Sequence, residues 1–193
     1  MLESIRFLSP LTMPLHFDWY AAEIGRSAIE ELAPYLVRSM QNQKLADNDE
    51  YHEWAMATSI HQVSPTATFV IVELDRCRRS DPSSHWRCYE KIYYGFLVEV
   101  VKSSLRTSFV FSISSLDAMR ELPIDEDIVD LVFSYRLVDR SRYDRHVSEI
   151  TFGWIEWTPP WEAEEGDRFF PIGSQTVTIG KRGSGYVIHS ALG

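Results

Sequence analysis

The chain of 193 residues is poor in cysteine and lysine, with two cysteines and four lysines. No stretch approaches the roughly 20 consecutive apolar residues of a membrane-spanning helix. The first residues, Met1 to Arg6, lack the basic start and long apolar core of a secretory signal, so we expect a cytoplasmic protein. Two cysteines cannot form a zinc site alone, and no histidine stands at ligand spacing from them. We therefore predict neither a metal nor another cofactor.

Motifs for catalysis are also missing. His52-Glu53 begins like a metalloprotease helix, but Met56 stands where the second zinc ligand must be. Ser184 lies between glycines without the strand, turn and helix of a nucleophile elbow. The remaining histidines are scattered, and a lone histidine is more often a surface or hydrogen-bonded residue than a catalyst. These absences favour a function other than catalysis.

Positive charge is in deficit, because 28 acidic residues outnumber 19 basic ones and give a net charge of −9. Nucleic acids and anionic lipids bind surfaces that turn positive charge toward their phosphates, so both are unfavoured as partners. The charge favours a basic protein partner or simple solubility.

Strand patterns fill the chain from about Thr66 onward. The clearest runs from Val129 to Leu137, where apolar and polar residues alternate with the period of two that defines the faces of a sheet. Such alternation indicates an antiparallel sheet with one wet face. We expect one face to bury Leu131, Phe133, Phe152, Phe109 and Phe111 together. The predicted strands are Thr68–Leu74, Lys91–Val101, Ser108–Ile113, Ile128–Val138, Val147–Trp157, Thr176–Ile179 and Tyr186–His189.

Helical spacing dominates before that point. Asp18 can cap a first helix, and Pro34 should end it or start a second one that reaches about Lys44. We expect one more helical turn at Tyr51–Met56. The predicted fold class is α+β, with N-terminal helices packed on a curved, mainly antiparallel sheet of about six to eight strands. We expect a single domain over residues 1–193, with 1–57 mainly helical and 66–193 mainly β.

The two cysteines flank a predicted hairpin turn, Ser80–Ser84. Cys77 and Cys88 could therefore face each other across the two strands. In a reducing compartment such thiols are more often free than bridged, so we expect no disulfide.

The last strands are joined by a run with three glycines, which permits the positive φ angles of a hairpin turn. Helices first, a curved antiparallel sheet afterwards and a closing hairpin ending in Gly185–His189 resemble the nuclear-transport-factor-2-like fold. The resemblance implies that the concave side of the sheet could hold a pocket. The catalytic dyads of that family's enzymes have no matching positions here, so it implies no activity.

Arginines gather in two places, each interleaved with aspartates. A guanidinium presents a planar fork suited to carboxylates and phosphates, so both groups are candidate anion-binding sites. The alternative is local ion pairing on solvated loops, which we favour because such pairs are common. The arginines concerned are Arg76, Arg78, Arg79, Arg87, Arg140, Arg142 and Arg145.

A tryptophan-rich, acidic loop follows the fifth predicted strand. Pro159 and Pro160 stiffen it, and tryptophans beside carboxylates would suit a basic partner surface. The alternative is a structural lid closing one end of the sheet. The candidate partner-binding residues are Trp157, Trp161, Glu162, Glu164, Glu165 and Asp167.

These patterns together favour a non-enzymatic intracellular protein that acts by protein binding or assembly. A toxin-neutralising immunity protein and a self-associating viral or phage structural subunit are the two forms that we expect. The alternative is a ligand-binding domain or small-molecule enzyme with a pocket inside the sheet. It would require ionisable side chains pointing inward, for which His189, Glu156 and Tyr135 are candidates.

Overall fold

The computed structural model describes residues 26–41, 44–101, 104–119, 131–141, 145–156 and 168–192. The chain divides into two compact units, Met1–Ser114 and Ser115–Gly193, which are described separately. The prediction that the whole chain forms a single domain stays a prediction. None of the described helices is long and apolar enough to cross a membrane.

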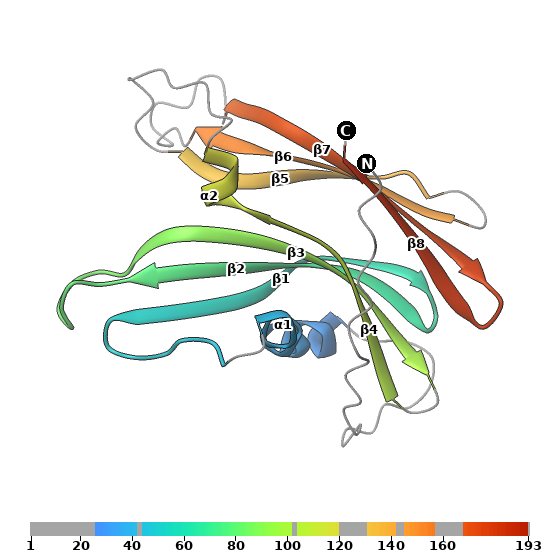
Figure 1. The fold of residues 1–193 in the computed structure, drawn as a ribbon, viewed down its shortest axis with the longest axis horizontal. Helices are drawn as coiled ribbons and strands as arrows, with labels where there is room; N and C mark the ends of the chain where they lie inside the picture. Colours follow the sequence, from blue (N-terminus) through green and yellow to red (C-terminus); the bar gives the residue numbers. More distant parts are fainter. Residues whose placement is uncertain are drawn as a thin grey trace. The chain divides into compact units, whose positions relative to one another are not determined.

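The described part of the first unit consists of one helix and a four-stranded antiparallel sheet (Figure 1). The strands follow one another in space as they do in sequence, β1-β2-β3-β4, so each pair is a hairpin. The elements are α1 (Arg26–Gln41), β1 (Tyr51–Ser64), β2 (Ala67–Arg78), β3 (Arg87–Val101) and β4 (Ser104–Ser114).

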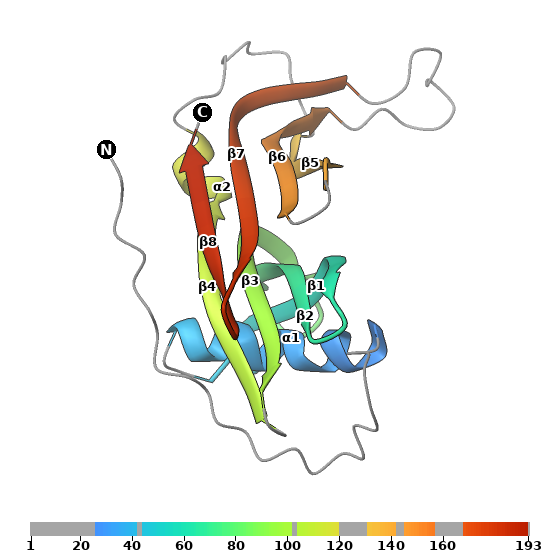
Figure 2. The ribbon, with the colours of Figure 1, turned by 90° about the vertical axis from the view of Figure 1, so that its right-hand side faces the viewer.

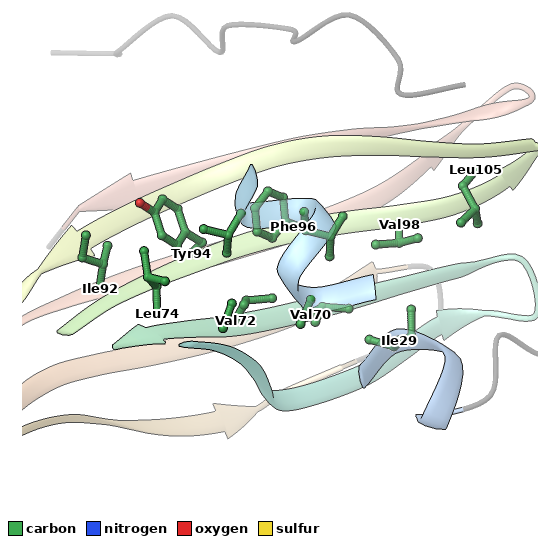
Figure 3. Packing of buried hydrophobic residues seen from close by; sticks show 13 residues of the cluster. Ile29, Val70, Val72, Leu74, Ile92, Tyr94, Phe96, Val98 and Leu105 are labelled. Carbon is green, nitrogen blue, oxygen red and sulfur yellow. The ribbon is translucent and has the colours of Figure 1, made fainter. Parts of the chain in front are cut away.

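Helix α1 packs on one face of this sheet. Ile29, Ala33, Leu36 and Val37 are buried together with residues of the three strands β1, β2 and β3, and with Leu105 of β4 (Figure 3). The expectation that Pro34 interrupts the helix is wrong, because it lies inside α1. A proline there removes one backbone hydrogen bond, and burial of the flanking apolar side chains offsets the loss.

Strand β1 replaces the helical turn expected at Tyr51–Met56, and this prediction is wrong. The strand is at the edge of the sheet, and register shifts interrupt its pairing with β2 between Ala57 and Ser59 and between Gln62 and Ser64. Bulges reverse the side-chain alternation, so the strand as a whole carries no clear period of two.

The second unit contains a short helix, α2 (Ser115–Ala118), and another four-stranded antiparallel meander, β5-β6-β7-β8. Its last two strands form a long hairpin (Figure 2), whose turn has Gly183 at a φ of 61°, as the glycine run predicted. The strands are β5 (Leu131–Asp139), β6 (Arg145–Glu156), β7 (Arg168–Arg182) and β8 (Gly185–Leu192).

Strand β7 is much longer than the predicted Thr176–Ile179. It contains Pro171, which is normally excluded from the middle of a sheet. Pairing with β8 begins only at Gln175, so the proline lies where β7 has a single neighbour and beside a register shift in β6. Both circumstances remove the need for a ladder hydrogen bond at that position.

The mainly antiparallel character, the number of strands and the presence of an N-terminal helix agree with the prediction, but the described elements are mainly β and do not support the α+β class. The strands form two separate sheets, however, and not the single curved one. The concave sheet implied by the nuclear-transport-factor-2-like resemblance is therefore not the architecture found. The expected shared face also divides. Phe133 and Phe152 pack together in the second sheet, while Phe109 and Phe111 lie in β4.

A register shift in β4 places these last two phenylalanines on opposite faces. Phe109 pairs with Phe96 and packs against the cluster under α1, whereas Phe111 pairs with Gly95. The two partners are adjacent in β3, and adjacent residues of a strand point to opposite faces. The intervening Val110 is the extra residue that reverses the pattern.

The prediction of free thiols is also wrong, because Cys77 and Cys88 form a disulfide across the β2–β3 hairpin. The two residues are direct partners in the strand register, as the predicted hairpin suggested. The pairing follows from the turn, but the oxidation state depends on the compartment, which the sequence does not encode at these positions.

Candidate binding surface

The acidic tryptophan loop lies outside the described residues, and so does Arg142. The prediction that this loop faces a partner therefore stays a prediction. It concerns Trp157, Trp161, Glu162, Glu164, Glu165 and Asp167. The other predicted site residues are six arginines. Some of them hydrogen-bond or pair with other described residues of the protein, and others do not.

Arg76 is bound within the sheet. Its Nε donates to Glu53 Oε1 at 2.8 Å and its Nη1 donates to Glu90 Oε2 at 2.9 Å, so it joins β1 to β3. Ser114 donates to the other oxygen of Glu90, and the backbone N–H of Ala46 donates to the other oxygen of Glu53. Burial lowers the pKa of Arg76, but its hydrogen bonds and charge interactions with Glu90 and Glu53 outweigh this effect and raise it. Both of its carboxylate partners are therefore supplied by neighbouring strands, which is a structural role.

Arg79 is bound as well, mainly to backbone. Its Nε donates to the carbonyl of Asp49 at 2.7 Å and its Nη1 to the carbonyl of Pro82 at 3.1 Å. The guanidinium also lies over the ring of Trp86, with 4.5 Å from Cζ to the ring centroid. Arg79 thus ties the loop before β1 to the β2–β3 turn, which is a structural role.

Arg78 and Arg87 differ from these two. They are direct cross-strand partners, and both side chains are exposed. Arg78 lies 5.8 Å from the ring centroid of Tyr89. Within the described ranges, neither forms an ion pair with a carboxylate.

The second arginine group does not form a common site. Arg140 pairs with Glu149 at 2.6 Å, whereas Arg145 lies at the start of β6 opposite Gly180. Arg140 thus forms a local ion pair of the kind expected from the sequence as the alternative to anion binding.

Exposed aromatic side chains gather at the same end of the first sheet as Arg78 and Arg87. Trp54 is 61% exposed, and Trp86 lies against His52 with 5.6 Å between ring centroids. Sequence reasoning missed this group because Tyr51–Met56 was taken as helical, and because Trp86 and Tyr89 follow a turn 30 or more residues later. We call it the aromatic end surface, formed by Tyr51, Trp54, Met56, Trp86 and Tyr89. It includes both faces of this end of the sheet, because Tyr51 opposes Arg78 on the face that α1 covers, whereas Trp54 and Met56 oppose Asp75 and Glu73 on the other face.

The aromatic end surface is held by cross-links on several strands. The disulfide joins β2 to β3, Arg76 joins β1 to both, and Arg79 anchors the two neighbouring loops. Asp81 adds a compact turn, because hydrogen bonds from Ser83 and Ser84 hold its carboxylate and lower its pKa to about 2. Exposed aromatics on such a braced support lose little conformational entropy when they bind.

An ionisable cluster occupies the face of the same sheet that is opposite α1. Lys91 Nζ lies 2.8 Å from Glu73 Oε1 and 3.7 Å from Asp75 Oδ1. Burial raises the pKa of Asp75, and Lys91 opposes this shift. Paired carboxylates beside a lysine occur in active sites and also in structural ion-pair networks.

A serine and histidine network lies at the β5–β6 hairpin. His146 is buried, with Nδ1 2.8 Å from Ser141 Oγ and Nε2 3.0 Å from Ser148 Oγ. Ser141 in turn donates to Asp139. The order resembles a nucleophile, base and acid, but Ser148 is completely buried, so a substrate could not reach its hydroxyl in this arrangement. We interpret the network as a polar brace of the hairpin.

The inward-pointing residues that would support a pocket are not gathered together. His189 is exposed, and Glu156 and Tyr135 are half-buried on different strands of the second sheet. Over the part of the chain that the structure describes, no three metal-ligating side chains are grouped. The predicted lack of a metal and of a cofactor stays a prediction.

Comparisons with protein-family models, with curated proteins and with solved structures give no match.

Proposed function

We propose that this protein acts without catalysis, by binding a protein partner or by assembling with copies of itself. The observation that carries the proposal is the aromatic end surface. Tryptophan, tyrosine and arginine are the residues most enriched among those that dominate binding energy at protein interfaces. This end of the sheet exposes four aromatic side chains, of which Tyr51 and Tyr89 lie beside Arg78. The other two are Trp54 and Trp86.

Two kinds of protein remain as forms of this proposal. A toxin-neutralising immunity protein would use the surface on a different protein, whereas a viral or phage structural subunit would use it on a second copy. Strand β1 is at the edge of the sheet, and the backbone of residues 46–48 already hydrogen-bonds to it at Tyr51 and Glu53. Only the part of β1 beyond Glu53 could pair with another strand, which supports assembly. The acidic loop at 157–167 is a second proposed contact, supported by its sequence alone.

The alternative is a ligand-binding or enzymatic role. The cluster of Glu73, Asp75 and Lys91 is the observation in its favour. We place it second because Lys91 forms ion pairs with both carboxylates, as in a structural ion-pair network.

An intracellular location belongs to the proposal as well. The disulfide between Cys77 and Cys88 is the observation against it, because such bonds are typical of oxidising compartments. Thiol-blocking mass spectrometry of protein taken from its own cells measures whether the bond is present there.

Site-specific photo-crosslinking in those cells tests the binding role. A benzophenone amino acid at Trp54 or Trp86 should give one defined adduct. The mass of the adduct tells a second copy from a different protein. Val138, which is equally exposed on β5, is the matched control and should give none. Replacing Trp54 with alanine should weaken the identified complex by about 2 kcal/mol or more in binding free energy, mainly because the complex dissociates faster.

Equal labelling from Val138 would show that the adducts are nonspecific. Adducts from positions in 157–167, with none from Trp54 or Trp86, would move the binding site to the acidic loop.

A further inference from the structure

Three successive cross-strand rows lie on the face of the first sheet that α1 covers. The innermost row is apolar and belongs to the core cluster under the helix: Ala55, Leu74 and Ile92 (Figure 3). The two rows beyond it are charged. In β2 the three central residues, Leu74, Arg76 and Arg78, are two apart and therefore share a face, and residues directly opposite each other on neighbouring strands lie on the same face. In β3 a register shift leaves Tyr89 as an extra residue, so Arg87 keeps its place in the outer row although it is three residues from Glu90.

In the middle row the arginine is paired with carboxylates on both sides. Arg76 stands between Glu53 and Glu90, its two cross-strand neighbours, and donates to both. The sheet therefore already holds an arginine against carboxylates in this geometry, one row in from the end.

The outer row repeats this arrangement without the carboxylates. Arg78 stands between Tyr51 and Arg87, so two guanidinium groups are direct neighbours where the middle row has an arginine and a glutamate. Like charges directly opposite each other destabilise a sheet. The described part of the chain supplies no carboxylate to either group. No ion pair among the described residues accounts for placing these two arginines opposite each other.

We propose that Arg78 and Arg87 recognise the carboxylates of an acidic segment in the protein partner. The inference rests on the proposed function, since it assigns partner chemistry to the aromatic end surface. Two adjacent guanidinium forks can bind two carboxylates with charge-assisted hydrogen bonds. The flanking rings of Tyr51 and Tyr89 shield these bonds from water.

Carboxylates fit this pair better than the phosphates of a nucleic acid do. The chain carries a net charge of −9, which opposes the long phosphate tracts of a nucleic acid but much less a short acidic segment. An acidic segment differs from the expected basic partner, and that expectation, which was drawn from the net charge of the whole chain, stays a prediction. At the point of contact, the two neighbouring guanidinium groups determine which charge on the partner is favoured.

An NMR titration with hexaglutamate peptide tests the inference on the whole protein. The Nε–Hε resonances of Arg78 and Arg87 should shift together and saturate, while that of Arg182, an exposed arginine of the β7–β8 turn, should not. Changing both Arg78 and Arg87 to glutamine should weaken binding about tenfold or more. The matched variant Arg182→Gln should leave it unchanged, although it also removes a positive charge.

Three results would overturn the inference: no shift at Arg78 and Arg87, an equal loss of affinity in Arg182→Gln, or tighter binding of hexathymidylate than of hexaglutamate. A fourth such result would be that the variant with both Arg78 and Arg87 changed to glutamine still binds hexaglutamate. If crosslinking at Trp54 still succeeds in that case, the surface stands and only its partner chemistry is wrong.

Discussion

The two sheets have the same topology but bury their side chains in different patterns. In β6 of the second sheet, burial alternates from residue to residue up to Phe152, whereas in β2 of the first sheet six consecutive residues from Ala67 to Val72 are all buried. The first sheet also contains a disulfide and ion pairs between its strands, while the buried polar groups of the second are neutral serine and glutamine side chains and a histidine. One hairpin meander can thus be stabilised by quite different chemistry.

The largest expected effect tests the alternation of the second sheet. Phe133 is buried against Phe152 and Trp154, so Phe133→Ala should lower the free energy of unfolding by about 3–5 kcal/mol. The adjacent Val132 points to the other face and is exposed, and Val132→Ala should change it by about 0.5 kcal/mol or less. Denaturant titration measures both, and similar losses would mean that the strand faces are assigned wrongly.

The next effect tests the cross-link of the first sheet. Replacing Cys77 and Cys88 with alanine removes the bond and should lower the free energy of unfolding by about 2–3 kcal/mol. Without the closed loop, the unfolded chain has more conformational entropy. The wild-type protein in reducing agent should show a similar loss, which serves as the control. If neither treatment changes the denaturation midpoint, the bond adds nothing to the stability of that sheet.

The smallest effect tests the charges of the first sheet. Burial raises the pKa of Glu99, and Arg106 opposes this. The native state therefore binds this proton more tightly than the unfolded chain does, and stability falls as pH rises through the interval between the ordinary and the raised pKa. Glu99→Gln removes that loss, so it should stabilise the protein at neutral pH by about 1 kcal/mol or less.

The gain from Glu99→Gln should vanish below the ordinary pKa of glutamate, where the group is protonated in both states. Arg106→Gln should act in the opposite direction at neutral pH, since it removes the opposing cation. Thermal unfolding followed from pH 4 to 8 provides the measurement. A stabilisation that is independent of pH would show that ionisation of Glu99 is not its cause.

The sequence predicted strands best where the sheet has one buried face. Alternation at Val129–Leu137 located β5, and the apolar runs at Thr68 and Lys91 located β2 and β3. The sequence did not predict β1, because an edge strand with two register shifts has neither a period of two nor a continuous apolar run. The division of the strands into two sheets was not predictable either, since hairpin patterns do not show where one meander ends.

For the site, composition identified the arginine group but not the role of each member. Arg76 and Arg78 are two residues apart and look equivalent in sequence, yet one meets two glutamates and the other meets Tyr51 and Arg87. Only the register of three strands decides this, and a bulge between Arg76 and Cys77 contributes to it. The disulfide shows the same limit, because the turn predicts the pairing but not the oxidation.

Each sheet has one glycine beneath an aromatic ring, and this pair of contacts restricts how the sequence can diverge. A Cβ on Gly95 would lie 2.6 Å from Cδ1 of Phe111, and a Cβ on Gly153 would lie 2.7 Å from Cζ of Phe169 and 2.9 Å from the backbone of Phe170. A smaller residue at 111 could make room for a side chain at 95, so those two positions are free to change together. Backbone cannot be exchanged in that way, so position 153 should remain glycine in every descendant of this fold. In an alignment with distant relatives, Gly153 is the position to anchor first, and 95 with 111 is the pair to examine for covariation.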